Sequence, residues 1–168
     1  IDNGIITARV SKVTGDLVSL RYKGREVFQS DLSPDFVPDT LGDSPADNLN
    51  WRNPQSTGRA HAYWSHDPMG PKGSAPAMPT VTIDPAQNGG KRAEVSIQGI
   101  SNGRKMGTGP GSGPDGQFIS DIEIRYSLGQ GEPGVYTYSV FEHTHEYGLT
   151  SLGEARFCAK LADIFDWM

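Results

Sequence analysis

The sequence predicts an all-β domain whose strands are joined by long Gly/Pro-rich loops. Glycine and proline account for 21 and 12 of the 168 residues, a share that excludes a helical bundle or a coiled coil. Short alternations of apolar and polar residues recur along the chain, as in strands with one buried face. Helical patterning is weak, since its best segment, 158–164, fits a strand equally well.

The N-terminal part predicts a meander of short strands. Residues 5–10, 17–22 and 26–28 are rich in β-prone side chains. Gly15-Asp16 and Lys23-Gly24 separate them with pairs of residues that favour tight turns. We therefore expect three strands connected in series at the start of the domain.

The middle of the chain predicts mainly loops. Segments 31–59, 68–79 and 101–116 are dense in residues that break regular structure, and loops of such length are usually functional or mobile. Residues 60–64 fit a short strand between the first two loops. The glycines of 111–116 match a dinucleotide-binding loop, but that loop opens a helix, whereas a strand follows here. A loop without a nucleotide is therefore favoured.

The remaining strands are predicted at 93–100, 118–128, 135–142 and 152–161. The alternation is clearest in 118–128, and it indicates one apolar and one polar face. The residues expected on the apolar face of this strand are Ile122, Ile124, Tyr126 and Leu128. The strand 152–161 is expected to bury Ala155, Phe157, Ala159 and Leu161.

The end of the sequence, 163–168, is apolar and resembles the beginning of a further strand. Chain ends are usually polar and loosely held. We therefore expect that residues 1–168 are the N-terminal part of a single β-sandwich domain, and that the natural polypeptide continues beyond Met168.

Charge and composition exclude several classes of partner. A formal net charge of −5 argues against a nucleic-acid-binding protein, which neutralises phosphates with basic residues. No apolar run approaches the roughly 18–20 residues of a membrane-spanning helix, so no membrane partner is expected. The single cysteine, Cys158, excludes an intramolecular disulfide, and without a base beside it in the sequence it is interpreted as a small, partly buried residue.

His143, His145 and Glu146 form the sharpest polar cluster in the sequence. On a strand the two histidines would share a face, roughly 6.5–7 Å apart, and could bind one metal ion. A third ligand is not identifiable, so a polar strand end lining a cleft is the favoured interpretation of His143, with surface histidines as a further alternative. We expect neither a metal nor a cofactor.

Arg156 and Lys160 share the polar face of the strand 152–161, roughly 13 Å apart. Two cations in an acidic protein suit a polyanionic ligand such as an acidic sugar chain, because arginine can bind a carboxylate through two parallel hydrogen bonds. The structural alternative is pairing with Glu123 and Glu142 across neighbouring strands.

Three aromatic residues lie in or beside the polar loops, namely Trp51, Tyr63 and Trp64. Flat rings in loops can stack on sugar rings. The alternative is that they pack as a satellite of the core beneath the loops.

Three stretches of the chain resemble the N-terminal part of rhamnogalacturonan lyases of polysaccharide lyase family 4. They are the opening IDNGII with GDLVSLRYKG at 15–24, the strand GVYTYSVFEH at 134–143, and LGEARFCAKL at 152–161. Their order and spacing follow the family across nearly the whole chain, while the middle, about 31–117, matches weakly.

The resemblance implies a β-supersandwich of the galactose-mutarotase-like kind, of which this chain is the N-terminal portion. It also implies cleavage of the rhamnose–galacturonate backbone of pectin by β-elimination. The family's proposed catalytic lysine and histidine lie downstream of Met168 and have no counterpart here. Its substrate-binding arginine matches Arg156, which would bind a galacturonate carboxylate.

The sequence therefore predicts a secreted or periplasmic polysaccharide lyase as the full-length parent. We expect this segment to contribute substrate-binding residues, with Arg156 first and Lys160 and His143 as further candidates. Its partners would be acidic polysaccharide and the remainder of the same polypeptide. Alone, the segment is expected to be inactive. The alternative is a non-catalytic carbohydrate-binding β-sandwich module.

Overall fold

The computed structural model describes residues 1–12, 15–28, 62–64, 78–100, 120–149, 155–159, 161–162 and 165. Within these ranges the regular structure is β-strand, apart from one short 3₁₀ turn at Pro85–Gln87. No helix in this part of the chain is long and apolar enough to cross a membrane. The prediction of an all-β domain is confirmed. The loops predicted at 31–59 and 101–116 lie outside the described residues.

The first sheet is antiparallel and has the order β1-β2-β4-β9, with β3 also paired to β2. Its strands are β1 (Ile6–Val10), β2 (Leu17–Tyr22), β3 (Arg25–Glu26), β4 (Ala62–Trp64) and β9 (Phe157–Ala159). The predicted N-terminal meander is confirmed. The turn between β2 and β3 is tight because Lys23 and Gly24 both adopt positive φ, 49° and 81°, as a two-residue hairpin turn requires.

The second sheet is antiparallel in the simple order β5-β6-β7-β8. Its strands are β5 (Met78–Ile83), β6 (Arg92–Gly99), β7 (Asp121–Gly129) and β8 (Tyr136–Glu142). The loop predicted at 68–79 is wrong at its last two residues, Met78 and Pro79, which belong to β5. Residues 68–77 lie outside the described ranges. Pro79 fits within β5 because β5 is an edge strand of the described sheet, where a missing N–H group is tolerated.

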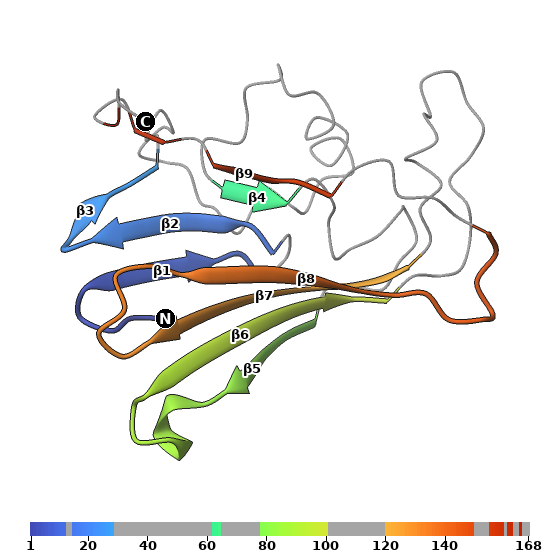
Figure 1. The fold of residues 1–168 in the computed structure, drawn as a ribbon, viewed down its shortest axis with the longest axis horizontal. Coiled ribbons are helices and arrows are strands. Elements are labelled where there is room, and N and C mark those ends of the chain that lie inside the picture. The colour runs from blue at the N-terminus through green and yellow to red at the C-terminus, as the bar shows by residue number, and fades with distance from the viewer. Residues whose placement is uncertain are drawn as a thin grey trace.

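The core lies where the two sheets pack together, because one cluster of buried residues draws on both; Figure 1 shows the strands of the first sheet above those of the second. Its buried residues are Ala8, Leu17, Phe28 and Ala62 from the first sheet and its flanks, and Ile122, Ile124 and Tyr126 from β7. The apolar face predicted for β7 is therefore confirmed. The fully buried Tyr126 also donates a hydrogen bond of 2.7 Å to the carbonyl of Gly15, which joins β7 to the turn before β2.

The C-terminal strand is shorter than predicted. Strand β9 covers Phe157–Ala159 only, and residues 151–154 and 160 lie outside the described ranges. Phe157 packs against the core, as expected. Ala155, Ala159 and Leu161 are exposed, contrary to the prediction. For Ala159 the reason is that β9 is the last strand in the order of the first sheet among the described residues, whereas Ala155 and Leu161 lie outside β9, where Leu161 forms an isolated bridge with Phe28.

We predict that removing the Tyr126 hydroxyl lowers the free energy of unfolding by about 1–3 kcal/mol, because the Gly15 carbonyl is left without a partner in a buried site. The measurement is urea unfolding of Tyr126→Phe followed by tryptophan fluorescence. The control is Tyr22→Phe, since the ring of Tyr22 is largely exposed. Equal stability of both variants and the wild type would contradict this account of the core.

Candidate functional site

Arg156 is exposed and lies directly before β9. In β9, Phe157 pairs with Trp64 on the core side, and Cys158 pairs with Tyr63. By strand alternation Arg156 belongs to the face of Cys158, the outer face of the first sheet. Lys160, the second predicted cation, lies outside the described residues.

The predicted alternative for Arg156, pairing with Glu123 and Glu142 across neighbouring strands, is wrong. It required β9 to lie beside β7 or β8, but β9 pairs with β4 in the other sheet. Glu123 is instead bound by Arg125 of its own strand. Two strands with complementary charges can belong to different sheets, which their sequences alone do not reveal.

His143 lies just beyond β8, because this strand ends at Glu142. Its Nε2 atom is 3.1 Å from the carbonyl oxygen of Gly148, and its ring meets Tyr147 edge-on with centroids 5.8 Å apart. A turn closed by the N–H of Tyr147 and the carbonyl of Thr144 follows the strand. His143 therefore follows a strand of the second sheet, whereas Arg156 precedes a strand of the first sheet.

The prediction that His143 and His145 share a strand face is wrong, since both lie in the turn region after β8. Within the described residues, no three or more His, Cys, Asp or Glu side chains are grouped as metal ligands would be. The turn is held by Tyr147, whose hydroxyl donates a 2.5 Å hydrogen bond to Asp121 at the start of β7. This bond raises the pKa of Tyr147 to about 12, because it stabilises the protonated phenol.

Trp64 has a packing role, as one of the two sequence interpretations proposed. Its ring lies 5.3 Å from that of Phe157, and its indole N–H donates a 3.1 Å hydrogen bond to Thr137 on β8. The bond connects the two sheets beside the core. Tyr63 is half-buried in β4, and Trp51 lies outside the described residues. Cys158 is a free thiol of intermediate burial, as predicted.

The outer face of the first sheet is basic. Arg9 on β1 and Arg21 on β2 are exposed, and alternation directs them away from the core. Glu26 on β3 and Asp2 partly offset them: the Glu26 carboxylate is 3.5 Å from Nε of Arg21, and Asp2 accepts a hydrogen bond from Thr7, the cross-strand neighbour of Arg21. We call Arg9, Arg21 and Arg156 the basic face. Among the described strand residues of this surface, cations therefore exceed anions.

The outer face of the second sheet combines tyrosines with buried polar groups. Strand β8 directs Tyr136, Tyr138 and Val140 outward, and all three are exposed. Next to them, alternating residues of β6 and β7 form a hydrogen-bonded polar layer. We call this surface the tyrosine face, defined by Tyr136, Tyr138, Arg92, Arg125, Glu94 and Glu123.

Arg125 is the centre of the tyrosine face. Its Nε and Nη2 atoms donate to the two carboxylate oxygens of Glu123 at 2.8 and 3.0 Å, which is the bidentate geometry favoured for this pair. Nη1 also reaches Glu94 at 3.3 Å. The guanidinium lowers the pKa of Glu123 below its usual value, and the Glu123 carboxylate in turn raises the pKa of Arg125.

Two further contacts extend this layer. Glu94 is buried and accepts hydrogen bonds from Thr82 on β5, at 2.9 Å, and from the Tyr138 hydroxyl, at 3.3 Å. Arg92 donates to Ser127 and to Glu132, at 2.9 Å each. The polar layer therefore connects all four strands of the sheet. In the sequence, the alternation of Tyr136 and Tyr138 is the one signal that points to this surface.

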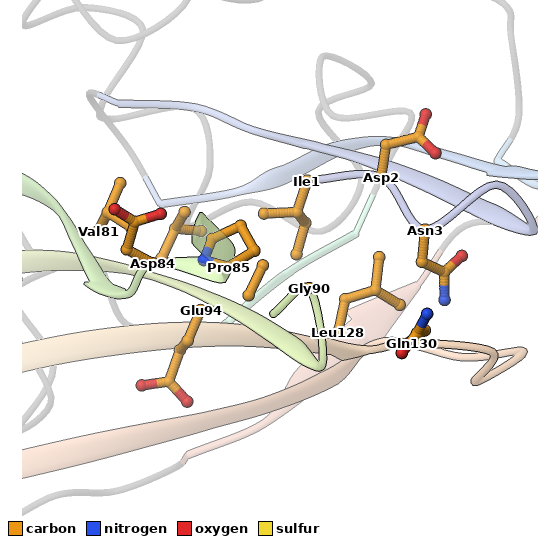
Figure 2. A pocket seen from close by; sticks show the side chains of 12 residues that line it. Ile1, Asp2, Asn3, Val81, Asp84, Pro85, Gly90, Glu94, Leu128 and Gln130 are labelled. Carbon is orange, nitrogen blue, oxygen red and sulfur yellow. The ribbon is translucent and has the colours of Figure 1, made fainter. Parts of the chain in front are cut away.

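A cavity of about 510 Å³ lies between the N-terminal residues and the turn from β5 to β6. Figure 2 shows Ile1, Pro85 and Leu128 around it, while the carboxylates of Asp2 and Glu94 point away. The amide of Asn3 on its rim already donates to the carbonyls of Gly129 and Glu132. The cavity therefore has mostly apolar walls, and the side-chain N–H group of Asn3 on its rim is already hydrogen-bonded within the protein.

Comparison of the chain with family models, curated proteins and solved structures found no match. The resemblance to rhamnogalacturonan lyases rests on the three sequence stretches alone.

We predict that Glu123 makes the stability of the domain depend on acid pH. Its pKa is below the usual value of 4.5 in the folded protein because of Arg125, so its stabilising effect is present above about pH 4.5 and is lost as the pH falls through the folded pKa. In urea unfolding, Glu123→Gln should be less stable than the wild type at pH 7, and the difference should shrink below pH 4.5.

The control for this experiment is Glu146→Gln, which removes an exposed carboxylate in the turn after β8. This variant should follow the wild type across the pH range. A constant difference between Glu123→Gln and the wild type at every pH would show that the Arg125 contact is not responsible.

Proposed function

We propose that this chain is the substrate-binding N-terminal part of a polysaccharide lyase that cleaves the rhamnose–galacturonate backbone of pectin. The single observation that carries the proposal is Arg156, which the resemblance identifies as a ligand of galacturonate. It is exposed before β9 on the outer face of the first sheet. An exposed guanidinium on a sheet surface can bind a uronate carboxylate through two parallel hydrogen bonds.

The charge distribution supports an acidic ligand at this face. The chain as a whole has a formal net charge of −5, yet the basic face carries Arg9, Arg21 and Arg156. Strands β1 and β9 are separated by three strand spacings, about 14 Å. A ligand that contacts both Arg9 and Arg156 is therefore longer than one sugar ring, which favours a polymer over a single uronic acid.

The reaction is a β-elimination at galacturonate. A base removes the proton α to the carboxylate, the electron pair forms the C4–C5 double bond, and the glycosidic oxygen on C4 leaves and takes up a proton. Cationic groups assist by stabilising the negative charge that develops on the carboxylate. We assign that binding role to Arg156, with Lys160 and His143 as further candidates. The base and acid are assigned to the remainder of the same polypeptide.

Because pectin is a polymer outside cells, we propose a secreted or periplasmic location. The alternative function is a non-catalytic carbohydrate-binding module, and the exposed tyrosine pair of β8 is the observation that favours it. The two functions differ in the longer gene product, which has lyase activity in the first case and only binding in the second.

We predict that Arg156→Gln weakens binding of rhamnogalacturonan oligosaccharides by about 10-fold to 100-fold, the effect of losing a charge-assisted hydrogen-bond pair. Isothermal titration calorimetry measures it. The matched control is Lys91→Gln, which removes one exposed positive charge from the turn before β6. Unchanged affinity of Arg156→Gln, or no binding by the wild type, would overturn the proposal.

We also predict that residues 1–168 have no lyase activity alone. The measurement is ultraviolet absorbance of the unsaturated uronate product after incubation with rhamnogalacturonan. Steady product formation by the purified chain would show that its own residues include the base and acid, and would refute the division of roles between this segment and the rest of the polypeptide.

A further inference from the structure

Strand β8 directs Tyr136, Tyr138 and Val140 outward, while Thr137 and Ser139 lie with Phe141 on its inner side. Tyr136 and Tyr138 are 59% and 41% exposed, whereas Thr137 and Ser139 on the opposite side are half-buried. The pairing with β7 causes this, because Thr137 lies opposite Tyr126, which must face the core. Two exposed aromatic rings on one strand face are unusual for a surface that only contacts water, and they point to a ligand.

The two tyrosines are spaced for an extended ligand. They are two residues apart on the same face, so their Cα atoms are roughly 6.5–7 Å apart. Each ring also has an arginine beside it, with Cζ of Arg92 and of Arg125 5.9 Å from the centroids of Tyr136 and Tyr138. Both arginines are in turn bound by carboxylates, Arg92 by Glu132 and Arg125 by Glu123.

The contacts with Arg92 and Arg125 hold the two tyrosine rings in position before a ligand binds. Side chains that are already ordered lose little conformational entropy on binding, and tyrosine supplies rigid contact area with a polar hydroxyl group. The polar layer beside the rings offers both kinds of hydrogen-bonding group. Arg92 and Arg125 are partly exposed donors, and the carboxylates of Glu123 and Glu132 are partly exposed acceptors. Sugar hydroxyls donate and accept hydrogen bonds, so they match such a surface.

Charge decides which sugar the tyrosine face can accept. The outward strand residues of the sheet include four carboxylates, Asp121, Glu94, Glu123 and Glu142, against the two guanidiniums of Arg92 and Arg125. An acidic sugar would be repelled by this balance, whereas a neutral one would not. The basic face on the other sheet has the opposite balance.

We propose that the tyrosine face is a binding site for a neutral oligosaccharide, with sugar rings stacked on Tyr136 and Tyr138 and hydroxyls bound by Arg92 and Arg125. The tyrosine face belongs to the second sheet, whereas Arg156 lies directly before β9 of the first sheet. It is argued from the second sheet alone, so it does not rest on the proposed lyase function.

The test is calorimetric titration of the chain with four neutral probes, namely cellohexaose, xylohexaose, mannohexaose and galactohexaose. At least one should bind, and the double variant Tyr136→Ala/Tyr138→Ala should weaken that binding tenfold or more, since two aromatic contacts are lost. The double variant Tyr136→Phe/Tyr138→Phe retains both rings and should bind more tightly than the alanine variant.

The matched control is Tyr22→Ala. Tyr22 is also an exposed strand tyrosine with a cation beside it, Lys23 Nζ at 5.3 Å from the ring centroid, but it belongs to the first sheet. It should leave binding of the neutral probe unchanged. Circular dichroism checks that each variant is folded, and the phenylalanine variant provides the comparison if the alanine variant is not.

Two outcomes would overturn the proposal: none of the four probes binds, or the alanine and phenylalanine variants bind the active probe equally well. Arg156→Gln separates this site from the proposed substrate site. It should retain neutral-probe binding while losing affinity for rhamnogalacturonan, so that failure at one face is distinguishable from failure at the other.

Discussion

The structure depends on the packing of β7 against the first sheet. Ile122, Ile124 and Tyr126 are buried on one side of β7, and the hydroxyl of Tyr126 reaches the Gly15 carbonyl. Because β6 and β8 both pair with β7 along their length, the orientation of β7 also decides which of their residues face outward. A one-residue shift of this strand would exchange every inward and outward side chain of the sheet.

One consequence is that the two outer surfaces of the sandwich differ in charge. The exposed arginines Arg9, Arg21 and Arg156 belong to the first sheet, with Arg21 beside Glu26, whereas on the second sheet Arg92 and Arg125 are each bound by glutamates. Ligands of different charge can therefore be bound on opposite sides of one small domain. In the two proposals the basic face binds uronate-containing chains and the tyrosine face binds neutral ones, since interacting surfaces must have complementary potentials.

A second consequence concerns the cost of burying charge. Glu94 lies in the outer layer of the second sheet, yet it is only 6% exposed. It remains stable there because Arg125, Thr82 and Tyr138 all contact its carboxylate. A buried carboxylate without such partners would be strongly unfavourable. The network therefore keeps both the arginine and the tyrosine in fixed positions on the surface.

Local patterns in the sequence determined the fold class and most of the strands. β-prone side chains identified β2, alternation identified β7, and turn residues such as Lys23-Gly24 identified the hairpins, because strand faces and tight turns depend on residues close together in the chain. The edge strand β5 was missed entirely, since Pro79 at its start is typical of a loop and no strand was predicted at 80–83, and β9 was expected to be longer and more buried than it is.

Only the tertiary structure decided which strands share a sheet and which faces are exposed. Arg156 and Glu142 looked like possible partners by charge, but β9 pairs with β4 in the first sheet, and β8 belongs to the second. Tyr136 and Tyr138 have the apolar character of core residues, yet they face outward because Tyr126 on the neighbouring strand occupies the core. Sheet membership depends on contacts between residues distant in sequence, so local alternation shows which residues share a strand face but not which face is buried.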